Sequence, residues 1–305
     1  MNKTSRNKNY VVALLLTITS LSLSSVCSAE SKLIQTKKFD VNDGGLITVK
    51  TSFGDVNISS WSNSEVEIRV YGNKKTADKI RFSFEKSGNE VIVKAEKKGN
   101  IGFNVFNNFE LKYEIKVPKN FSSSVATAGG DISMNGLNGE FEFKTSGGDI
   151  EIADNVGKTR AFTSGGDIEI KNHKGNIKAE TSGGDIKIQT FGNVDCGTSG
   201  GDIDLICENG SVNAGTSGGD VALKYWGKNY GIKCETSGGD ISCVVPDNFK
   251  ADVELKTIGG DIDLNFANAN TNKISHSKFY GKFNGGGEKF ICTTIGGSIK
   301  VNSSK

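Results

Sequence analysis

The amino-acid sequence predicts an all-β protein, a two-sided β-solenoid or β-roll of about nine rungs of ~18 residues, preceded by an antiparallel β cap. The hexapeptide Thr-Ser-Gly-Gly-Asp-Ile, which begins for example at Thr145 and Thr163, recurs through residues 122–305 and sets this period. A second glycine recurs midway between the Gly-Gly pairs, so each period contains two short strands and two tight turns. Glycine accounts for 39 of 305 residues and proline for only 2, which is typical of a turn-rich β protein.

Apolar residues alternate with polar ones on both strands of each period, which indicates strands with one buried face. The expected core therefore consists of inward columns, one of which contains Ile132, Ile150, Ile168, Ile186, Ile203, Val221, Ile241 and Ile262. A left-handed hexapeptide helix has a similar coil length but needs an inward aliphatic residue every six positions. Ile177 is followed by Ile186, nine positions later, and this spacing favours the two-sided roll.

The turn residues carry three further predictions. Glycine at both positions of each Gly-Gly pair is expected to allow a positive φ where the chain reverses. The threonine of the hexapeptide is expected to point inward and to form hydrogen bonds along the solenoid axis. The aspartates after the Gly-Gly pairs form a column of Asp131, Asp149, Asp167, Asp185, Asp202, Asp220, Asp240 and Asp261. We expect each carboxylate to cap its own turn, with cation binding along this edge as the alternative.

Residues 1–29 have the organisation of a secretory signal peptide, because a basic start precedes an apolar run and then small residues. Cleavage is expected after Ala29, with export to the periplasm, the outer-membrane surface or the extracellular space. A lipoprotein anchored through Cys27 is the alternative, although Val26 stands where such signals have a small residue. No second apolar run is long enough to span a membrane.

Residues 30–121 lack the ~18-residue period and are expected to form an antiparallel β cap that covers the open edge of the solenoid. Residues 47–58 are a degenerate copy of the repeat, and a single helical turn is predicted at 76–79. Near the other end, residues 265–287 form either a divergent rung or a loop over the end of the rod. Residues 289–301 then close the chain as its last rung.

Charge and motif content argue against several classes of function. The formal charge of +2 includes Lys3, Arg6 and Lys8, and without these three it becomes −1, which disfavours nucleic acid and acidic membrane surfaces as partners. The Gly-Gly runs are not phosphate-binding loops, because no helix follows them. His173 and His276 lack partner patterns and are expected to be surface residues, so no catalytic residues and no cofactor are predicted.

Five cysteines follow the predicted signal peptide, and all have the inward parity: Cys196, Cys207, Cys234, Cys243 and Cys292. We expect them to act as small buried apolar residues. A Cys234–Cys243 disulfide is the alternative, although facing sheets about 10 Å apart exceed disulfide reach unless the roll narrows there. Because no Cys-x-x-Cys pair occurs, no metal site is predicted.

Several motifs together resemble a known family. Phe39-Asp-Val41, the segment Thr51–Ile58, the strand ending at Val117-Pro118 and the serial Gly-Gly-Asp-Ile repeats are similar to the bacterial β-strand-repeat family called "putative adhesin". That family is of unknown function and akin to the head domain of autotransporter adhesins. The resemblance covers residues 33–301 and implies a β-repeat fold, but it implies no catalytic residues.

Aromatic residues outside the core columns are the predicted binding residues: Tyr225, Trp226 and Tyr230 in a turn that lengthens the period to 20, and Phe103, Phe106 and Phe109 in an Asn-rich loop. Exposed rings can stack on sugars, whereas rings that plug the edges of the roll would be structural. The predicted function is an exported, non-enzymatic adhesin or envelope-binding scaffold whose partner is a glycan or an envelope protein. Two hypotheses stay open beside it: an envelope structural or stress-response component that binds another protein, and a polysaccharide-active enzyme, which would need clustered acids in a groove.

Overall fold

The computed structural model describes residues 31–98 and 110–304 of the chain. The described residues belong to one compact unit. The predicted signal peptide, 1–29, and three of the predicted binding residues, Phe103, Phe106 and Phe109, lie outside the described residues. No helix in the described ranges is long and apolar enough to cross a lipid bilayer.

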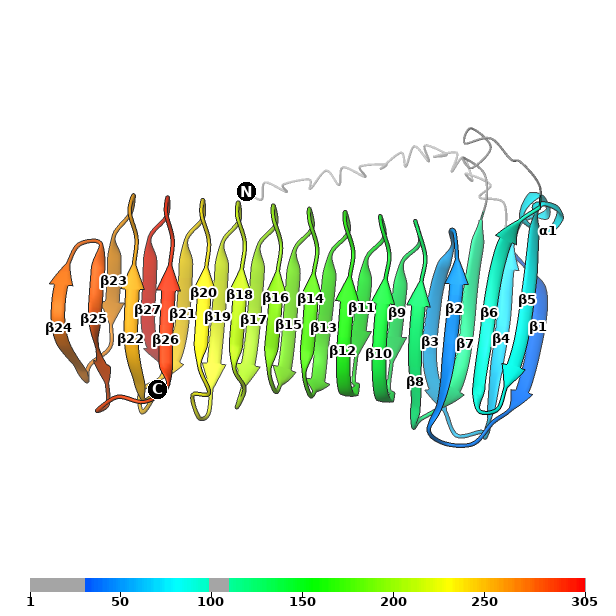
Figure 1. Cartoon of the computed structure of the whole chain (residues 1–305), viewed down its shortest axis with the longest axis horizontal. Coiled ribbons are helices and arrows are strands. Elements are labelled where there is room, and N and C mark those ends of the chain that lie inside the picture. The colour runs from blue at the N-terminus through cyan, green and yellow to red at the C-terminus, as the bar shows by residue number, and fades with distance from the viewer. Residues whose placement is uncertain (1–30, 99–109, 305) are drawn as a thin grey trace, which may run out of the picture. The chain divides into compact units, whose positions relative to one another are not determined.

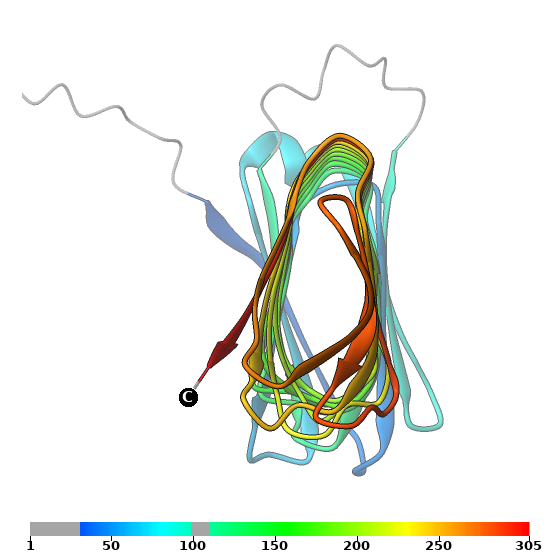
Figure 2. The ribbon, with the colours of Figure 1, turned by 90° about the vertical axis from the view of Figure 1, so that its left-hand side faces the viewer.

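The described chain contains 27 strands, which pair into one continuous sheet that coils into two facing layers (Figures 1 and 2). In each rung, one strand lies on the first face, a Gly-Gly-Asp turn follows, and the next strand lies on the second face. Neighbouring strands of the first face are, in order, β5 (Ile80–Ser87), β6 (Glu90–Lys97), β2 (Gly45–Thr51), β8 (Phe121–Ala126), β10 (Asn138–Lys144), β12 (Val156–Phe162), β14 (Ile177–Glu180), β16 (Val194–Gly197), β18 (Val212–Gly215), β20 (Ile232–Glu235), β26 (Lys289–Thr293), β22 (Ala251–Lys256), β25 (Lys278–Phe283) and β24 (Ala269–Ser275). Those of the second face are β1 (Lys32–Asp40), β4 (Glu65–Gly72), β7 (Leu111–Pro118), β3 (Asp55–Trp61), β9 (Ile132–Asn135), β11 (Ile150–Ala153), β13 (Ile168–Lys174), β15 (Ile186–Phe191), β17 (Ile203–Glu208), β19 (Val221–Trp226), β21 (Ile241–Pro246), β27 (Ile299–Ser304) and β23 (Ile262–Asn265). The predicted all-β, two-sided solenoid is confirmed.

Equivalent residues of successive rungs lie side by side. Ile150 pairs with Ile168, and Ile168 pairs with Ile186, in a parallel ladder. These residues point between the two faces and are fully buried, as the alternation predicted, whereas Ile262 at the far end of its column is only partly buried. The core is therefore a narrow apolar layer, and the residues between the inward ones form two outward surfaces.

Close packing, rather than backbone conformation, requires glycine in the Gly-Gly pairs, which corrects the prediction of positive φ. None of these paired glycines in the described ranges has a φ in the left-handed region. A Cβ atom on Gly166 would lie 2.0 Å from the carbonyl oxygen of Gly148 in the preceding rung. A Cβ on Gly165 would meet nothing closer than 3.7 Å. The left-handed conformation occurs in the opposite turn, where Gly157 and Gly175 have φ values of 137°.

Two hydrogen-bond ladders run along the edge formed by the Gly-Gly-Asp turns. The Thr181 hydroxyl donates to the Gly166 carbonyl of the preceding rung at 2.9 Å, and equivalent threonines repeat this bond, which confirms the predicted hydroxyl ladder. Beside it, the Asp149 carboxylate accepts the backbone N–H of Asp167. From Asp131 to Asp240, each carboxylate therefore caps the next rung, and the prediction that it caps its own turn is wrong.

At the N-terminal end, the ladders change from parallel to antiparallel pairing. The strands β2 and β3 form the first rung and pair in parallel with β8 and β9. Beyond this rung, β6 carries the antiparallel strand β5, and β7 carries β4, which pairs in turn with β1. The predicted antiparallel cap is present, and the helix α1 (Lys74–Lys79) in it includes the predicted helical turn.

The last rung in the sequence is inserted between two earlier ones. Strand β26 pairs in parallel with both β20 and β22, and β27 pairs with both β21 and β23. The preceding hairpin, β24 and β25, pairs antiparallel with β22 and covers the end of the first face (Figure 1). Residues 265–287 thus form an end cap, and residues 289–301 fold back into the rod instead of closing it.

Candidate functional site

Two hollows on the outward surface of the second face are candidate binding sites. One, which we call the junction hollow, lies where β7 of the cap and β3 of the first rung meet β9, β11 and β13. The other, which we call the aromatic groove, lies further along the same face, over the ends of β13, β15, β17 and β19. Both hollows are therefore built on paired strands, which hold their side chains in fixed register.

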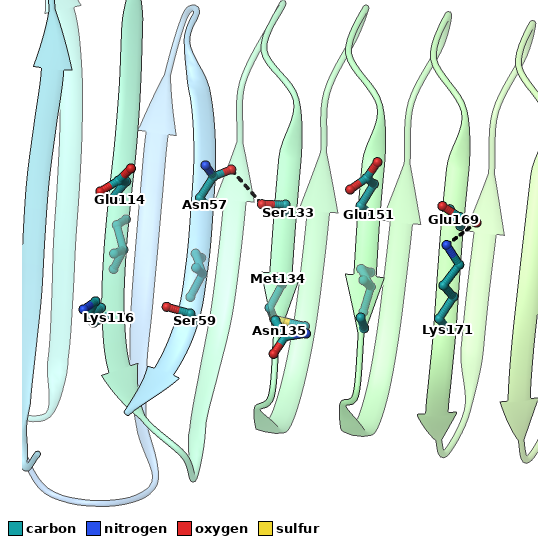
Figure 3. Close-up of a pocket in the computed structure, with 14 residues that line it drawn as sticks. Asn57, Ser59, Glu114, Lys116, Ser133, Met134, Asn135, Glu151, Glu169 and Lys171 are labelled. Atoms are coloured by element: carbon teal, nitrogen blue, oxygen red, sulfur yellow. Dashed lines mark hydrogen bonds and ion pairs between the residues drawn. The ribbon is translucent and has the colours of Figure 1, made fainter. Parts of the chain in front are cut away.

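The junction hollow has a volume of about 410 Å³ and is partly open to solvent. Its outward lining residues are polar: Glu114, Lys116, Asn57, Ser59, Ser133, Asn135, Glu151, Glu169 and Lys171 (Figure 3). The hollow forms because short side chains such as Ser59 and Asn135 stand between the longer Lys116 and Lys171. Its polar groups already pair with one another, as in the bond of 2.6 Å from Ser133 Oγ to Asn57 Oδ1.

The carboxylates of the junction hollow lack the properties of a glycosidase pair. A hydrogen bond from Lys112, with the ammonium 2.9 Å from the carboxylate, lowers the pKa of Glu114, so this group is an ionised acceptor and not a proton donor. Glu151 is exposed, and the Glu169 carboxylate is paired with Lys171 at 2.7 Å. Glycoside hydrolysis needs one carboxylic acid with a raised pKa, and the hydrogen bond from Lys112 shifts the pKa of Glu114 in the opposite direction.

The aromatic groove has a volume of about 380 Å³, and large apolar side chains line its solvent-facing part. Phe191, Glu208 and Trp226 lie opposite one another in register at the ends of three neighbouring strands. Ile206 lies in the adjacent outward column, next to Gln189. Phe191 is 48% exposed, and Trp226 and Ile206 are each 40% exposed. Large apolar side chains that gather in this way on a soluble surface indicate a binding region.

The positions of Phe191 and Trp226 at the ends of their strands explain why both rings point outward. Each ring is the last residue of its strand and directly precedes a turn glycine, Gly192 or Gly227, that has a left-handed φ. The residue before each ring, Thr190 or Tyr225, points into the core and is buried. Alternation along the strand therefore directs Phe191 and Trp226 to solvent.

Buried hydrogen bonds make the floor of the groove rigid. The Tyr225 hydroxyl donates to the Gly210 carbonyl at 2.7 Å and lies 2.6 Å from the Lys228 carbonyl, and burial raises the pKa of Tyr225 to about 12. In the same inward column, the Thr190 hydroxyl donates to the His173 carbonyl at 3.1 Å. The groove is thus supported from below by buried, hydrogen-bonded side chains.

The predicted binding residues have different locations. Trp226 lies in the aromatic groove, but Tyr225 is fully buried, so the prediction that it offers an exposed ring is wrong. Tyr230 is 50% exposed in the following loop, where the Lys228 ammonium lies 5.2 Å from its ring centre, and it does not line the groove. Sequence reasoning missed Phe191 and Ile206, although strict alternation along their strands would have marked both as outward.

The histidine predictions need a correction as well. His173 is 1% exposed, and its ring Nε2 lies 3.1 Å from the Gly157 carbonyl, so it is a core residue and not a surface one. Burial lowers the pKa of His173, which keeps the imidazole neutral. The cause is Asn172, whose left-handed φ of 50° inserts an extra residue and reverses the parity of β13. His276 is exposed, as predicted.

Comparison with known proteins identifies related folds. The family model described as Toastrack DUF4097 matches residues 45–302. Among solved structures, the chain is similar to a putative adhesin from Bacteroides fragilis, with 13% identity, a TM-score of 0.45, and coverage of 88% of this chain and 97% of that one. It is also similar to a putative lipid binding protein from Parabacteroides distasonis, with 14% identity, a TM-score of 0.42, and coverage of 89% and 96%. No curated protein matches the sequence.

Proposed function

The chain belongs to the Toastrack DUF4097 family, and from that premise we propose that it is an exported, non-enzymatic scaffold that binds saccharides through the aromatic groove. The observation that carries this proposal is the in-register column of Phe191, Glu208 and Trp226 on the second face. Two half-exposed rings lie two rungs apart, a separation of roughly 10 Å on one sheet. This spacing suits two stacking contacts along one extended ligand.

The groove combines the two kinds of contact that sugar rings need. The faces of Phe191 and Trp226 can cover the apolar C–H surface of a sugar ring. Around them, the side chains of Gln189, Glu208 and Lys174 supply hydrogen-bond donors and acceptors for hydroxyl groups. Strand pairing fixes all of these residues before a ligand arrives, so little conformational entropy is lost on binding.

The apolar area of the two rings that a ligand could still bury is small, which predicts weak binding at a single groove. Fully burying a large apolar side chain contributes about 1.5–3 kcal/mol, and roughly half of each ring is already covered. The two rings together would thus contribute on the order of 2 kcal/mol before the polar contacts are added. Firm attachment to a surface would then come from many copies that bind a repetitive polysaccharide at once.

The proposed lack of enzymatic activity rests on the surroundings of the acidic groups. Glu208 lies between the two rings but is exposed, and Glu114 is held in its ionised form, so neither resembles a desolvated acid catalyst. His173, the one histidine beneath the groove, is sealed in the core. An envelope component that binds another protein through the same face is the competing function, and co-purification of a protein in place of a saccharide would favour it.

A glycan array probed with the purified protein tests the proposal. We expect binding to a subset of polysaccharides, and a loss of about fivefold in apparent affinity for Trp226→Ala and for Phe191→Ala, which corresponds to about 1 kcal/mol per ring. Tyr230→Ala is the matched control, because it removes an equally exposed ring that lies outside the groove. Failure to bind any saccharide, or an equal loss in the Tyr230→Ala variant, would overturn the proposal.

A further inference from the structure

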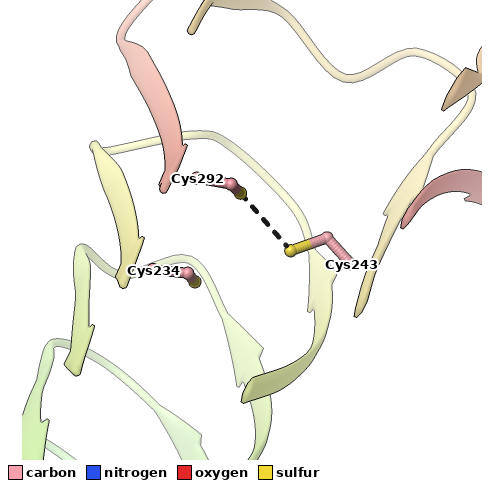
Figure 4. A group of neighbouring side chains, drawn as sticks. All are labelled: Cys234, Cys243 and Cys292. Carbon is pink, nitrogen blue, oxygen red and sulfur yellow. Dashed lines mark hydrogen bonds between the residues drawn. The ribbon is translucent and has the colours of Figure 1, made fainter. Parts of the chain in front are cut away.

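Three buried thiols meet in the core where the C-terminal rung is inserted. Cys234 lies on β20, Cys243 on β21 and Cys292 on β26, and all three side chains are fully buried. Their Sγ atoms all lie within 4.8 Å of one another, and those of Cys243 and Cys292 are 3.8 Å apart (Figure 4). In the described part of the chain, no other three histidine, cysteine or acidic residues converge in this way.

The arrangement does not suit a disulfide. All three cysteines are free, so the alternative prediction of a Cys234–Cys243 bond is wrong. Cys234 and Cys292 are in-register neighbours on the first face, whereas Cys243 approaches from the second face. Facing sheets lie about 10 Å apart, while a disulfide needs Cα atoms within about 7 Å of each other. The thiols therefore meet tip to tip, with their sulfur atoms close together but not bonded.

We propose that Cys234, Cys243 and Cys292 bind one Cu(I) ion as a three-sulfur site. A metal–sulfur bond of about 2.3 Å in a trigonal arrangement places the sulfur atoms roughly 4 Å apart. The observed separations, from 3.8 Å to at most 4.8 Å, need only small side-chain rotations to reach that geometry. Copper binds as Cu(I) and keeps that oxidation state. Each thiol that becomes a thiolate releases one proton.

The surroundings of the three sulfurs favour a soft ion with few ligands. On the first face, Cys234 lies beside Ala214 of the neighbouring strand. On the second face, Cys243 lies between Leu223 and Val301 of its two neighbouring strands. These neighbours offer no oxygen or nitrogen side-chain ligand. Structural Zn²⁺ takes four ligands in a tetrahedron, which this site lacks, whereas thiolates in an apolar setting select Cu(I).

Bound copper would fasten the inserted rung to the rung that precedes it. Cys292 is 49 residues beyond Cys243 in the sequence, so an ion shared by both bridges the fold-back of the chain. An unfolded chain cannot hold the three sulfurs together, and binding therefore stabilises the folded state. Other cysteines, such as Cys196, have no such partners and serve as small apolar residues.

Because the site is sealed, the test loads the metal during refolding. The protein is refolded under anaerobic, reducing conditions with Cu(I), or with Zn²⁺ in parallel, and then treated with a strong chelator of the same ion. Metal content per chain and melting temperature are measured. The matched variants are Cys234→Ala and Cys196→Ala, because both positions belong to one inward column in which Ala179 and Ala214 already occur.

We expect the wild type and Cys196→Ala to keep one copper per chain and to melt at a higher temperature than the metal-free protein. Cys234→Ala should keep less than about a tenth of that copper. No retained copper in the wild type, equal retention in Cys234→Ala, or preferential retention of zinc would overturn the proposal. X-ray absorption of the loaded wild type provides a second measurement, which does not depend on any variant folding: three sulfur neighbours support the site, and nitrogen or oxygen neighbours contradict it.

Discussion

The Asp149 carboxylate accepts the backbone N–H of Asp167 at 2.8 Å, so each aspartate of the repeat caps the rung that follows it. The bond recurs from Asp131 to Asp240, and the Asp240 carboxylate caps Ser298, the first residue after the Gly-Gly pair of the inserted rung. A column of like charges at about 4.8 Å spacing repels, and these charge-assisted bonds offset the repulsion. The aspartate column therefore has a structural explanation that needs no bound cation.

Substitutions of Asp185, in the middle of the aspartate column, distinguish the contribution of its hydrogen bond to stability from the contribution of its charge. In Asp185→Asn the side-chain oxygen can still accept the Asp202 N–H, and one repelling charge is gone, so we expect stability equal to or above that of the wild type at low salt. Asp185→Ala removes the acceptor and should cost about 0.5–1.5 kcal/mol. Urea denaturation at two salt concentrations measures both effects. Equal losses in the two variants would show that charge, and not the bond, is what matters.

The two glycines of one turn should respond very differently to substitution. A Cβ on Gly184 would lie 2.0 Å from the Gly166 carbonyl oxygen, and the backbone of the stacked rungs cannot move apart locally. We expect Gly184→Ala to destabilise the protein by roughly 2–4 kcal/mol. Gly183→Ala meets nothing closer than 3.7 Å and should be close to neutral. Thermal denaturation compares the pair, and similar melting temperatures would contradict the stacking geometry.

The hydroxyl ladder is tested at Thr181. Its hydroxyl donates to Gly166 and accepts from the Gly184 N–H, so Thr181→Val leaves two backbone groups without this partner. We expect a loss of about 1–3 kcal/mol for Thr181→Val. Thr181→Ser keeps the hydroxyl and should lose less, although it also removes a buried methyl group. Chemical denaturation measures the free energy of unfolding of both variants. A Thr181→Val variant as stable as the wild type would contradict a stabilising role of the hydroxyl ladder.

His173 should make stability depend on pH. Burial holds its folded pKa below the unfolded value of about 6.5, so the unfolded chain takes up a proton first as the pH falls. The contribution of neutral His173 is complete above that pH and declines below it, with a slope of at most about 1.4 kcal/mol per pH unit. Melting temperatures between pH 7.5 and 5.5 should therefore fall more steeply for the wild type than for His173→Gln. His276→Gln, at an exposed position, is the control and should keep the wild-type slope.

The fold could be predicted because every rung repeats the same local pattern. A fixed period and strict alternation determine which residues of β15, such as Ile186 and Ile188, face inward, and stacking follows from them. The order of the rungs could not be predicted, because all rungs offer similar edges. Strand β26 pairs with both β20 and β22 and separates these two strands, although β22 comes first in the sequence. Only the packed structure decides where the last rung lies.

The candidate sites were predicted less completely, for two physical reasons. Asn172, which has a left-handed φ, reverses the inward–outward alternation of β13 and so buries His173. The repeat pattern of the sequence gives no sign of this extra residue. The aromatic groove and the thiol cluster depend on contacts between rungs, so their members are far apart in the sequence. Tyr225, by contrast, follows the alternation of Val221 and Leu223, and extending that pattern by one step predicts its burial.

The proposed saccharide contact can be observed directly, because Trp61 and Trp226 are the only tryptophans in the chain. Trp61 lies in the cap, where its indole N–H donates to the Glu65 carbonyl, and Trp61→Phe leaves Trp226 as the sole fluorescent reporter. Titration of this variant with a polysaccharide selected on the array is the decisive measurement. The account predicts a saturable shift in Trp226 emission with the same midpoint as binding. Binding that leaves the Trp226 emission unchanged would contradict it.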